Sequence, residues 1–243
     1  MSGSARVEVF RGETVESAHR VHVAVVDGLG NVVSSAGDAR FMTFLRSAAK
    51  PFQALAAVEG GAADRYGLDE RELALLCGSH AGEPGHVKLA ESILHKAGLS
   101  ASALRCGSHA PRTKAAKDAL GGARATPLHH NCSGKHAGML LLQRHLGGEP
   151  ERYLDPAGPA QRAVLAAVAR VAGVPEAEVR VATDGCSAPN FALPLDRAAL
   201  LFARLAMPQG VPASTAAALG RLRDAMVRHP DVVAGRALLD ADL

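Results

Sequence analysis

The chain is poor in aromatic residues and has no long apolar run. Only 3% of its 243 residues are aromatic and none is tryptophan, so leucine, valine and alanine must fill the interior. The apolar run at 198–203 meets Arg204 long before the roughly 20 residues that cross a bilayer. The N-terminus carries Arg6, Arg11 and Glu13 and lacks the apolar segment of a secretory signal. We therefore expect a cytoplasmic protein with no membrane partner.

The chain also lacks a basic block and a dense cysteine pattern. Its 27 basic and 24 acidic residues are interspersed and give a net charge of +3. Without a Lys/Arg-rich segment that carries aromatic residues, nucleic acid is not an expected partner. The cysteines are few and widely spaced, which favours reduced thiols or metal ligands over disulfides. They are Cys77, Cys106, Cys132 and Cys186.

The order of predicted elements favours an α+β fold in a single domain. With 48% hydrophobic residues, the chain can bury one substantial core. Residues 21–26 and 31–35 are rich in β-formers around a glycine-bearing turn, and we expect residues 7–10 to pair alongside this hairpin. Strands come first, helices dominate the middle and a lone strand follows, which favours an antiparallel sheet over βαβ units. Helices are predicted at 47–58, 70–76, 85–97, 136–146, 159–171, 196–205 and 213–228, a strand at 178–183, and an irregular stretch at 106–136.

The first stretch with catalytic potential is 46–52, where Ser47 lies three residues before Lys50. Residues three apart share a helix face, so the lysine amine can reach the serine hydroxyl. A neutral amine could take the hydroxyl proton and create a nucleophile. Pro51 is tolerated if Ser47 is the helix N-cap. The alternative is a capping serine beside a solvated lysine.

A second stretch, 77–86, places Ser79 between a glycine and a histidine in a polar loop after an apolar helix. Such loops present hydroxyl and backbone N–H groups to ligands, although an ordinary helix-ending turn would look the same. The pentapeptide Cys-Gly-Ser-His-Ala occurs at 77–81 and again at 106–110. Two copies with different flanks do not make a solenoid.

A third and a fourth stretch carry metal-binding and charged side chains. Residues 129–139 combine histidines, Cys132 and Lys135 before an apolar helix, where backbone donors could hold an anion or soft ligands could hold zinc. Cys186 is the obvious distant partner, but a polar loop with capping histidines is the alternative. In 183–190, Asp184 ends a strand that we expect to be buried, and its carboxylate could bind a substrate ammonium. A plain Asp-Gly turn competes with that interpretation.

Together these stretches resemble the L-asparaginase family of the thermolabile Rhizobium etli type, also called class 3 asparaginases. The resemblance implies a fold like that of serine β-lactamases, penicillin-binding proteins and glutaminases. It also implies amide hydrolysis of L-asparagine by Ser-Lys chemistry, a role in asparagine catabolism and a homodimer. It runs through RSAAKPFQAL (46–55), CGSHAGEPGHV (77–87), LHHNCSGKHAGML (128–140), YLDPAGPAQ (153–161) and VATDGCSAPNFALPL (181–195).

The resemblance also implies a role for individual residues. Ser47 falls on the nucleophile and Lys50 on its activating base, while Ser79 falls on a second active-site serine. Zinc is implied as a cofactor that positions the pocket and does not generate hydroxide. Its ligands would be Cys132, Lys135 and Cys186, and the substrate-binding residues would be Arg46, His136 and Asp184.

The family has a second lysine in a C-terminal segment that lies beyond Leu243. We therefore expect the domain 1–243 to be incomplete at its C-terminus, without its last strands, and the enzyme to be weakened. Such a loss would expose a sheet edge and leave Ser79 without a cationic partner.

Three other interpretations remain open from the sequence. One is a different Ser-x-x-Lys acyltransferase, such as a glutaminase or a β-lactamase-like enzyme, although the late Lys-Thr-Gly strand of the latter is absent from the sequence. A second is a relative that binds an amino acid or zinc without turnover. A third is a zinc-binding structural domain. The sequence does not separate asparagine from glutamine as the substrate.

Overall fold

The computed structural model describes residues 5–236 and 238–239. Leu243, where we expected the chain to be incomplete, lies outside the described residues. The strands are β1 (Ala5–Arg11), β2 (Thr14–Val21), β3 (Val23–Val26), β4 (Val32–Ala36), β5 (Met42–Phe44), β6 (Arg180–Thr183) and β7 (Pro189–Pro194). The helices are α1 (Lys50–Glu59), α2 (Ala62–Arg65), α3 (Glu70–Cys77), α4 (Pro84–Lys96), α5 (Lys114–Leu120), α6 (Ser133–His145), α7 (Pro159–Ala172), α8 (Leu195–Ala206), α9 (Ala213–Arg228) and α10 (Pro230–Val233).

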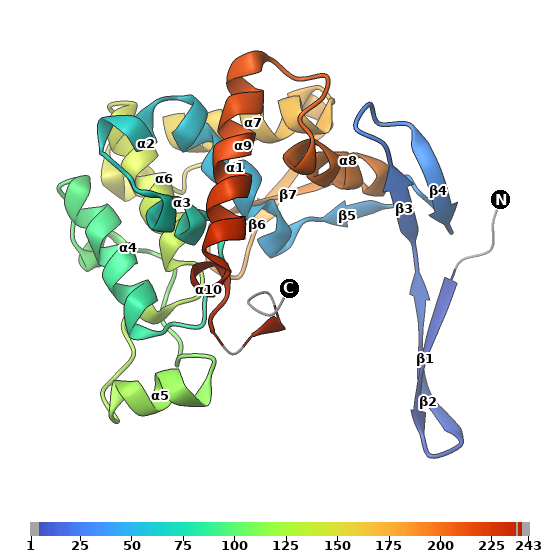
Figure 1. Ribbon diagram of the computed structural model, residues 1–243, viewed down its shortest axis with the longest axis horizontal. Coiled ribbons are helices and arrows are strands. Elements are labelled where there is room, and N and C mark those ends of the chain that lie inside the picture. Colours follow the sequence, from blue (N-terminus) through green and yellow to red (C-terminus); the bar gives the residue numbers. More distant parts are fainter. Residues whose placement is uncertain (1–4, 237, 240–243) are drawn as a thin grey trace.

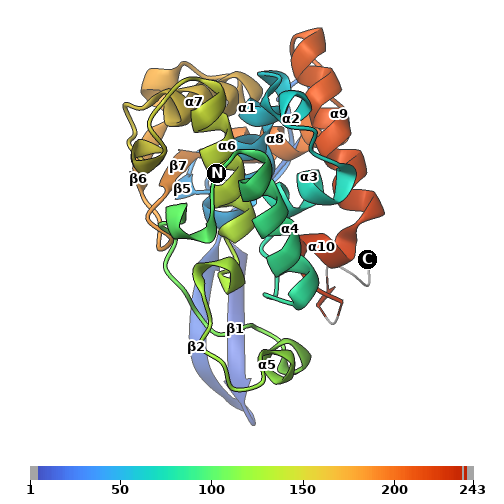
Figure 2. The same ribbon diagram turned by 90° about the vertical axis from the view of Figure 1, so that its left-hand side faces the viewer.

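The architecture is α+β with small antiparallel sheets. Strands β1 and β2 form one hairpin, β3 and β4 a second, and β5, β7 and β6 a three-stranded sheet in that order. The helices gather on one side of the molecule, and the β1–β2 ribbon extends away from them (Figures 1 and 2). Helix α8 packs against β3 and joins the second hairpin to the helical body.

Most predicted elements are confirmed, and the errors concern strands and short helices. Residues 7–10 do not pair with the 21–35 hairpin, because β1 pairs with β2. Strand β2 was not predicted, since its sequence is largely polar. The strand near 178–183 is not alone, since it pairs with β7, which begins and ends at a proline and was missed. This strand, β6, is exposed, whereas we expected it to be buried. Within the irregular stretch 106–136 lies the short helix α5.

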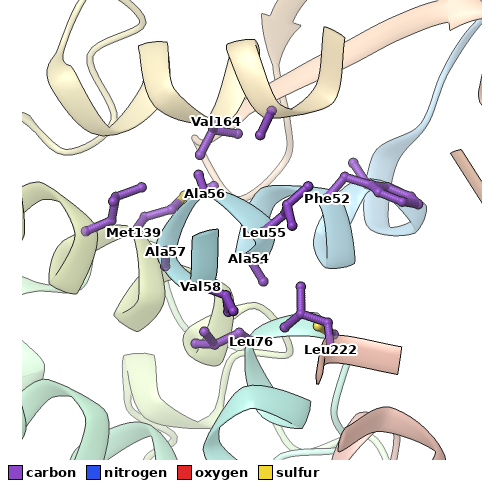
Figure 3. Close-up of a cluster of buried hydrophobic side chains, with 14 of the residues drawn as sticks. Phe52, Ala54, Leu55, Ala56, Ala57, Val58, Leu76, Met139, Val164 and Leu222 are labelled. Atoms are coloured by element: carbon purple, nitrogen blue, oxygen red, sulfur yellow. The ribbon is translucent and has the colours of Figure 1, made fainter. Parts of the chain in front are cut away.

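Helix α1 is the centre of the hydrophobic core. Every residue from Lys50 to Val58 is buried, because the helix packs against α3, α6, α7 and α9 at once. Figure 3 shows its side chains meeting Val164 of α7, Met139 of α6 and Leu222 of α9. Each buried apolar side chain of this size stabilises the fold by about 1.5–3 kcal/mol. The first residue of the most buried helix is thus a lysine.

The first two hairpins contribute little to this core. Their strands leave large apolar side chains in solvent, among them Val9, Phe10, Val25 and Val33, which are 44–68% exposed. The core is therefore built from helices and from β7, in which Pro189 to Leu193 are buried. Among the described residues, we find no helix that combines the length and the apolar character needed to cross a bilayer.

Two glycines of α6 allow it to approach α3 closely. A Cβ atom on Gly134 would lie 2.5 Å from the carbonyl oxygen of Leu75, and one on Gly138 would lie 2.7 Å from the Leu76 side chain. A backbone oxygen cannot move aside as a side chain can. Gly134 therefore sets the separation between the two helices whose ends carry the candidate site residues.

We expect Gly134→Ala to lower the free energy of unfolding by about 1–3 kcal/mol, because its methyl group would overlap the α3 backbone. The matched control is Gly220→Ala in α9, where the nearest atom to an added Cβ is 3.9 Å away. This control should raise stability by about 0.5–1 kcal/mol, the usual gain of alanine over glycine in a helix. Urea unfolding measures both, and equal effects would contradict the close approach.

Candidate active site

Ser47 lies on a strained turn that leads from the sheet into α1. The β5–β7 pairing continues to Leu45, whose N–H donates to the Phe191 carbonyl at 2.9 Å. Arg46 then takes a positive φ of 51°, which is uncommon for a residue with a side chain. Its N–H donates to Asn190 Oδ1 at 3.0 Å, which holds the turn. Backbone strain of this kind clusters at functional sites.

Ser47 is not the N-cap of α1, so the alternative of a capping serine beside a solvated lysine is wrong. The N-cap is Ala49, and Ser47 belongs to a preceding 3-10 turn, Arg46–Ala49, in which its carbonyl accepts the Lys50 N–H. Ser47 is exposed, whereas Lys50 is buried. Ser47 therefore lies at the surface, and Lys50 lies one turn further along the chain in the interior.

Lys50 is fully buried, and its amine has three oxygen atoms within hydrogen-bond distance. Its Nζ lies 2.5 Å from the Gly78 carbonyl oxygen, 3.0 Å from the Asn131 carbonyl oxygen and 2.8 Å from Ser79 Oγ. The amine donates in all three contacts, to the two carbonyl oxygens and to the Ser79 hydroxyl oxygen. If the amine loses a proton, two N–H groups can still serve the carbonyls while its lone pair takes the Ser79 hydroxyl proton. Among the described residues, the serine hydroxyl that hydrogen-bonds to the Lys50 amine is that of Ser79 and not that of Ser47.

Burial lowers the pKa of Lys50 from 10.5 to about 8. Desolvation of the ammonium is the main cause, and the nearby Lys135 acts in the same direction, while the Cys132 thiolate opposes it. An amine with this pKa is partly neutral near physiological pH and can accept a proton. The spacing of Ser47 and Lys50 suggested that the lysine acts as a base. The fold buries its amine, and this burial brings the pKa into the range that a base requires.

The loop that carries Ser79 is held from a segment far along the chain. Arg112 donates from its backbone N–H to the Ala81 carbonyl at 2.8 Å and from Nη1 to the Ser79 carbonyl at 2.9 Å. The two Cys-Gly-Ser-His-Ala copies differ in place: His80 contacts Ser133 Oγ at 2.9 Å, and His109 Nε2 accepts the Asn131 N–H at 3.1 Å. The first copy thus holds the start of α6, and the second holds Asn131 just before it, whose carbonyl contacts Lys50.

Two thiols and a lysine converge beside this amine. Cys132 is the N-cap of α6, Lys135 lies in its first turn, and Cys186 lies in the turn between β6 and β7. Lys135 Nζ lies 3.1 Å from Cys186 Sγ, and Cys186 donates a hydrogen bond to Cys132. That hydrogen bond, with the charges of Lys50 and Lys135, lowers the pKa of Cys132 to about 5 and raises the pKa of Cys186. The pair thus holds one negative charge at neutral pH.

Metal binding by these residues rests on an unusual donor set. Within the residues that the structure describes, no three His, Cys, Asp or Glu side chains lie close enough to hold a metal ion. Cys132 and Cys186 do touch, and the third group is the buried amine of Lys135. Thiolates and a neutral amine are ligands that zinc accepts, so the donor chemistry fits.

Opposite charges meet at the rim of the site. Asp184 Oδ2 lies 3.8 Å from Lys135 Nζ, and Asp184 Oδ1 lies 4.0 Å from the guanidinium of the exposed Arg46. Asp184 also makes the tight turn that the competing interpretation predicted, because its Oδ1 accepts the Gly185 N–H at 2.9 Å. The turn and the carboxylate at the site are therefore compatible.

His136 is buried behind the thiols. Its Nδ1 lies 2.7 Å from the Tyr153 hydroxyl, and its side chain interacts with Cys186. Tyr153 and Asn190 were not recognised from the sequence as site residues, although both lie in the stretches that carried the resemblance. No local signal marks the carbonyl of Asn131, because its role depends only on where the backbone runs.

The comparison with protein families agrees with this arrangement. The chain matches the family described as L-asparaginase II over residues 7–243, and a search of curated proteins finds no significant match. The family implies an amidohydrolase with a small-molecule substrate and suggests asparagine hydrolysis. The asparaginase resemblance is therefore confirmed at the family level: the chain belongs to the L-asparaginase II family.

Proposed function

We propose that this chain hydrolyses the side-chain amide of L-asparagine to L-aspartate and ammonia through an acyl-enzyme on Ser47. The observation that carries the proposal is the buried amine of Lys50, with a pKa of about 8, in contact with Ser79 and one turn from Ser47. A base whose pKa lies near the working pH is suited to move a hydroxyl proton. Membership of the family supports the substrate.

The reaction divides into two acyl transfers. In the first, Ser47 Oγ bonds to the amide carbon while its proton passes to Lys50. The carbon–nitrogen bond then breaks, and the nitrogen leaves as ammonia after taking that proton by way of Ser79. In the second, water attacks the ester, aspartate leaves and the Ser47 hydroxyl is restored. Backbone N–H groups near Ser47 or in residues 132–136 would stabilise the oxyanion by about 3–4 kcal/mol.

Substrate recognition would use the charges at the rim. Asp184 would bind the ammonium of the substrate amino acid, and the exposed Arg46 would bind its carboxylate. The 4.0 Å separation between these two side chains supports this role. When an amino acid binds, its ammonium can replace Arg46 beside Asp184, and its carboxylate can replace Asp184 beside Arg46. His136 would line the same pocket.

Zinc would be held by Cys132, Lys135 and Cys186. When bound, it would replace the protons on the thiols and the lysine and fix the mutual positions of α6 and the β6–β7 turn. The close approach of Lys135 Nζ to Cys186 Sγ, at 3.1 Å, supports this set. Its role in the proposal is positional, and the proton transfers belong to Lys50 and Ser79.

We expect Ser47→Ala to lower kcat by about 10³-fold or more and to abolish any covalent adduct with asparagine, because the nucleophile is gone. Ser79→Ala should slow both steps by about 10²–10⁴-fold and still form the adduct. Ammonia release and the mass of the quenched protein measure the two effects. Ser108→Ala, in the exposed second copy of the pentapeptide, is the matched control and should leave both unchanged. An adduct that survives in Ser47→Ala but not in Ser79→Ala would make Ser79 the nucleophile.

The activity should rise with pH through a midpoint near 8, because the neutral form of Lys50 is the base. Since its pKa is lower in the folded chain than the unfolded value of 10.5, the unfolded chain binds more protons between about 8 and 10.5. The free energy of unfolding therefore increases with pH between about 8 and 10.5 because of this residue. Lys50→Met should remove both the activity and this increase. Lys88→Met, at an exposed lysine, is the control, and a flat pH–rate profile would contradict the assignment.

The purified chain should bind zinc, and Cys132→Ala and Cys186→Ala should weaken binding. Cys77→Ala should keep it, because burial raises the pKa of the Cys77 thiol to about 12 and the thiol stays protonated at neutral pH. Binding should also weaken as pH falls, since protons compete for the thiols and the lysine. Metal analysis and chelator titration measure these changes. Activity that vanishes on zinc removal and returns with zinc would argue against a purely positional role.

A further inference from the structure

The stretch 153–161 carries part of the family resemblance, yet the proposed reaction does not use it. Its first residue, Tyr153, is fully buried, and its hydroxyl lies 2.7 Å from His136 Nδ1. Its last residue, Gln161, donates to the Tyr153 carbonyl at 2.7 Å. The two ends of the stretch are therefore hydrogen-bonded to each other, and the Tyr153 hydroxyl contacts His136.

The hydrogen bonds around this hydroxyl decide where the proton of His136 lies. The backbone N–H of Arg105 donates to the Tyr153 oxygen at 2.8 Å. An N–H group can only donate, so the oxygen accepts there and its own proton is left for His136 Nδ1. A proton on Nδ1 would instead leave a buried hydroxyl without an acceptor. Burial also raises the pKa of Tyr153, which keeps the hydroxyl protonated.

With Nδ1 as an acceptor, a neutral His136 carries its proton on Nε2. The ring is neutral in this arrangement, because an imidazolium would carry a proton on both nitrogens and Nδ1 could not accept. Nε2 is buried and has no partner at normal hydrogen-bond length among the described residues. His136 and Cys186 lie near enough for each to affect the pKa of the other, so the Nε2–H group lies on a ring close to a thiol of the candidate zinc site.

We propose that Tyr153 is a positioning residue that fixes His136 as its Nε2–H tautomer, so that the free nitrogen of the ring carries an N–H and offers no lone pair to a metal. Such a donor orients a thiolate ligand and stabilises its charge. The consequence for zinc rests on the proposed function, but the tautomer does not.

The tautomer can be observed directly in the metal-free protein. Long-range proton–nitrogen correlation NMR on histidine labelled with nitrogen-15 should show a protonated Nε2 and an unprotonated Nδ1 for His136, assigned by its absence in His136→Gln. A protonated Nδ1 would overturn the proposal, and this measurement stands even if the Tyr153 variant does not fold. In Tyr153→Phe the Nδ1 signal should shift downfield, because the nitrogen loses its hydrogen-bond donor. An unmoved signal would also overturn the proposal.

The effect on the metal is measured by competition with a chromophoric chelator. Tyr153→Phe should lower zinc affinity by about 10–100-fold. Thr215→Val removes another buried hydroxyl, which donates to Glu59 at 2.5 Å, and should leave zinc affinity unchanged. Equal losses would reduce Tyr153 to a stabilising role and overturn the proposal, as would zinc that deprotonates Nε2 and binds there. If the parent chain binds no zinc, the zinc part of the proposed function fails, while the NMR experiment still decides the tautomer.

Discussion

The burial of one amine is the constraint on which the site depends. Lys50 begins α1, against which α3, α6, α7 and α9 pack, and its Nζ contacts two backbone carbonyls and one hydroxyl. These three partners come from two segments: Gly78 and Ser79 from the loop after α3, and Asn131 from the segment before α6. A cation in such a place is costly, and the fall of its pKa to about 8 is the direct result. The same packing that stabilises the fold therefore produces the base.

The rest of the site follows from the charges around that amine. Lys135 lies close enough to lower the pKa of Lys50 further, and Cys132 becomes an anion between the two lysines. Asp184 balances Lys135 on the other side at 3.8 Å. The two lysine amines and the two thiols therefore titrate as coupled groups. In such a cluster a metal can replace a proton on a ligand, and a neutral amine can accept a proton from a hydroxyl.

Much of the fold was predictable because its helices have strong local signals. The apolar spacing and terminators of α3, α4, α7, α8 and α9 gave boundaries within a few residues of those observed. The strands were harder. Strand β2 is mostly polar and exposed, and β7 is bounded by prolines, so neither has the alternation that marks a half-buried strand.

For the site, the sequence by itself determined which chemical groups are present and the family to which they belong. Serine and lysine three residues apart and cysteines flanked by lysine and aspartate are local facts, and local patterns can be read from the chain. Only the tertiary structure decided that the Lys50 amine meets Ser79, that the Asn131 carbonyl is its third partner and that Tyr153 faces His136. These contacts join residues 17 to 81 positions apart. Burial and backbone direction depend on the packing of whole helices, so no short stretch of sequence contains them.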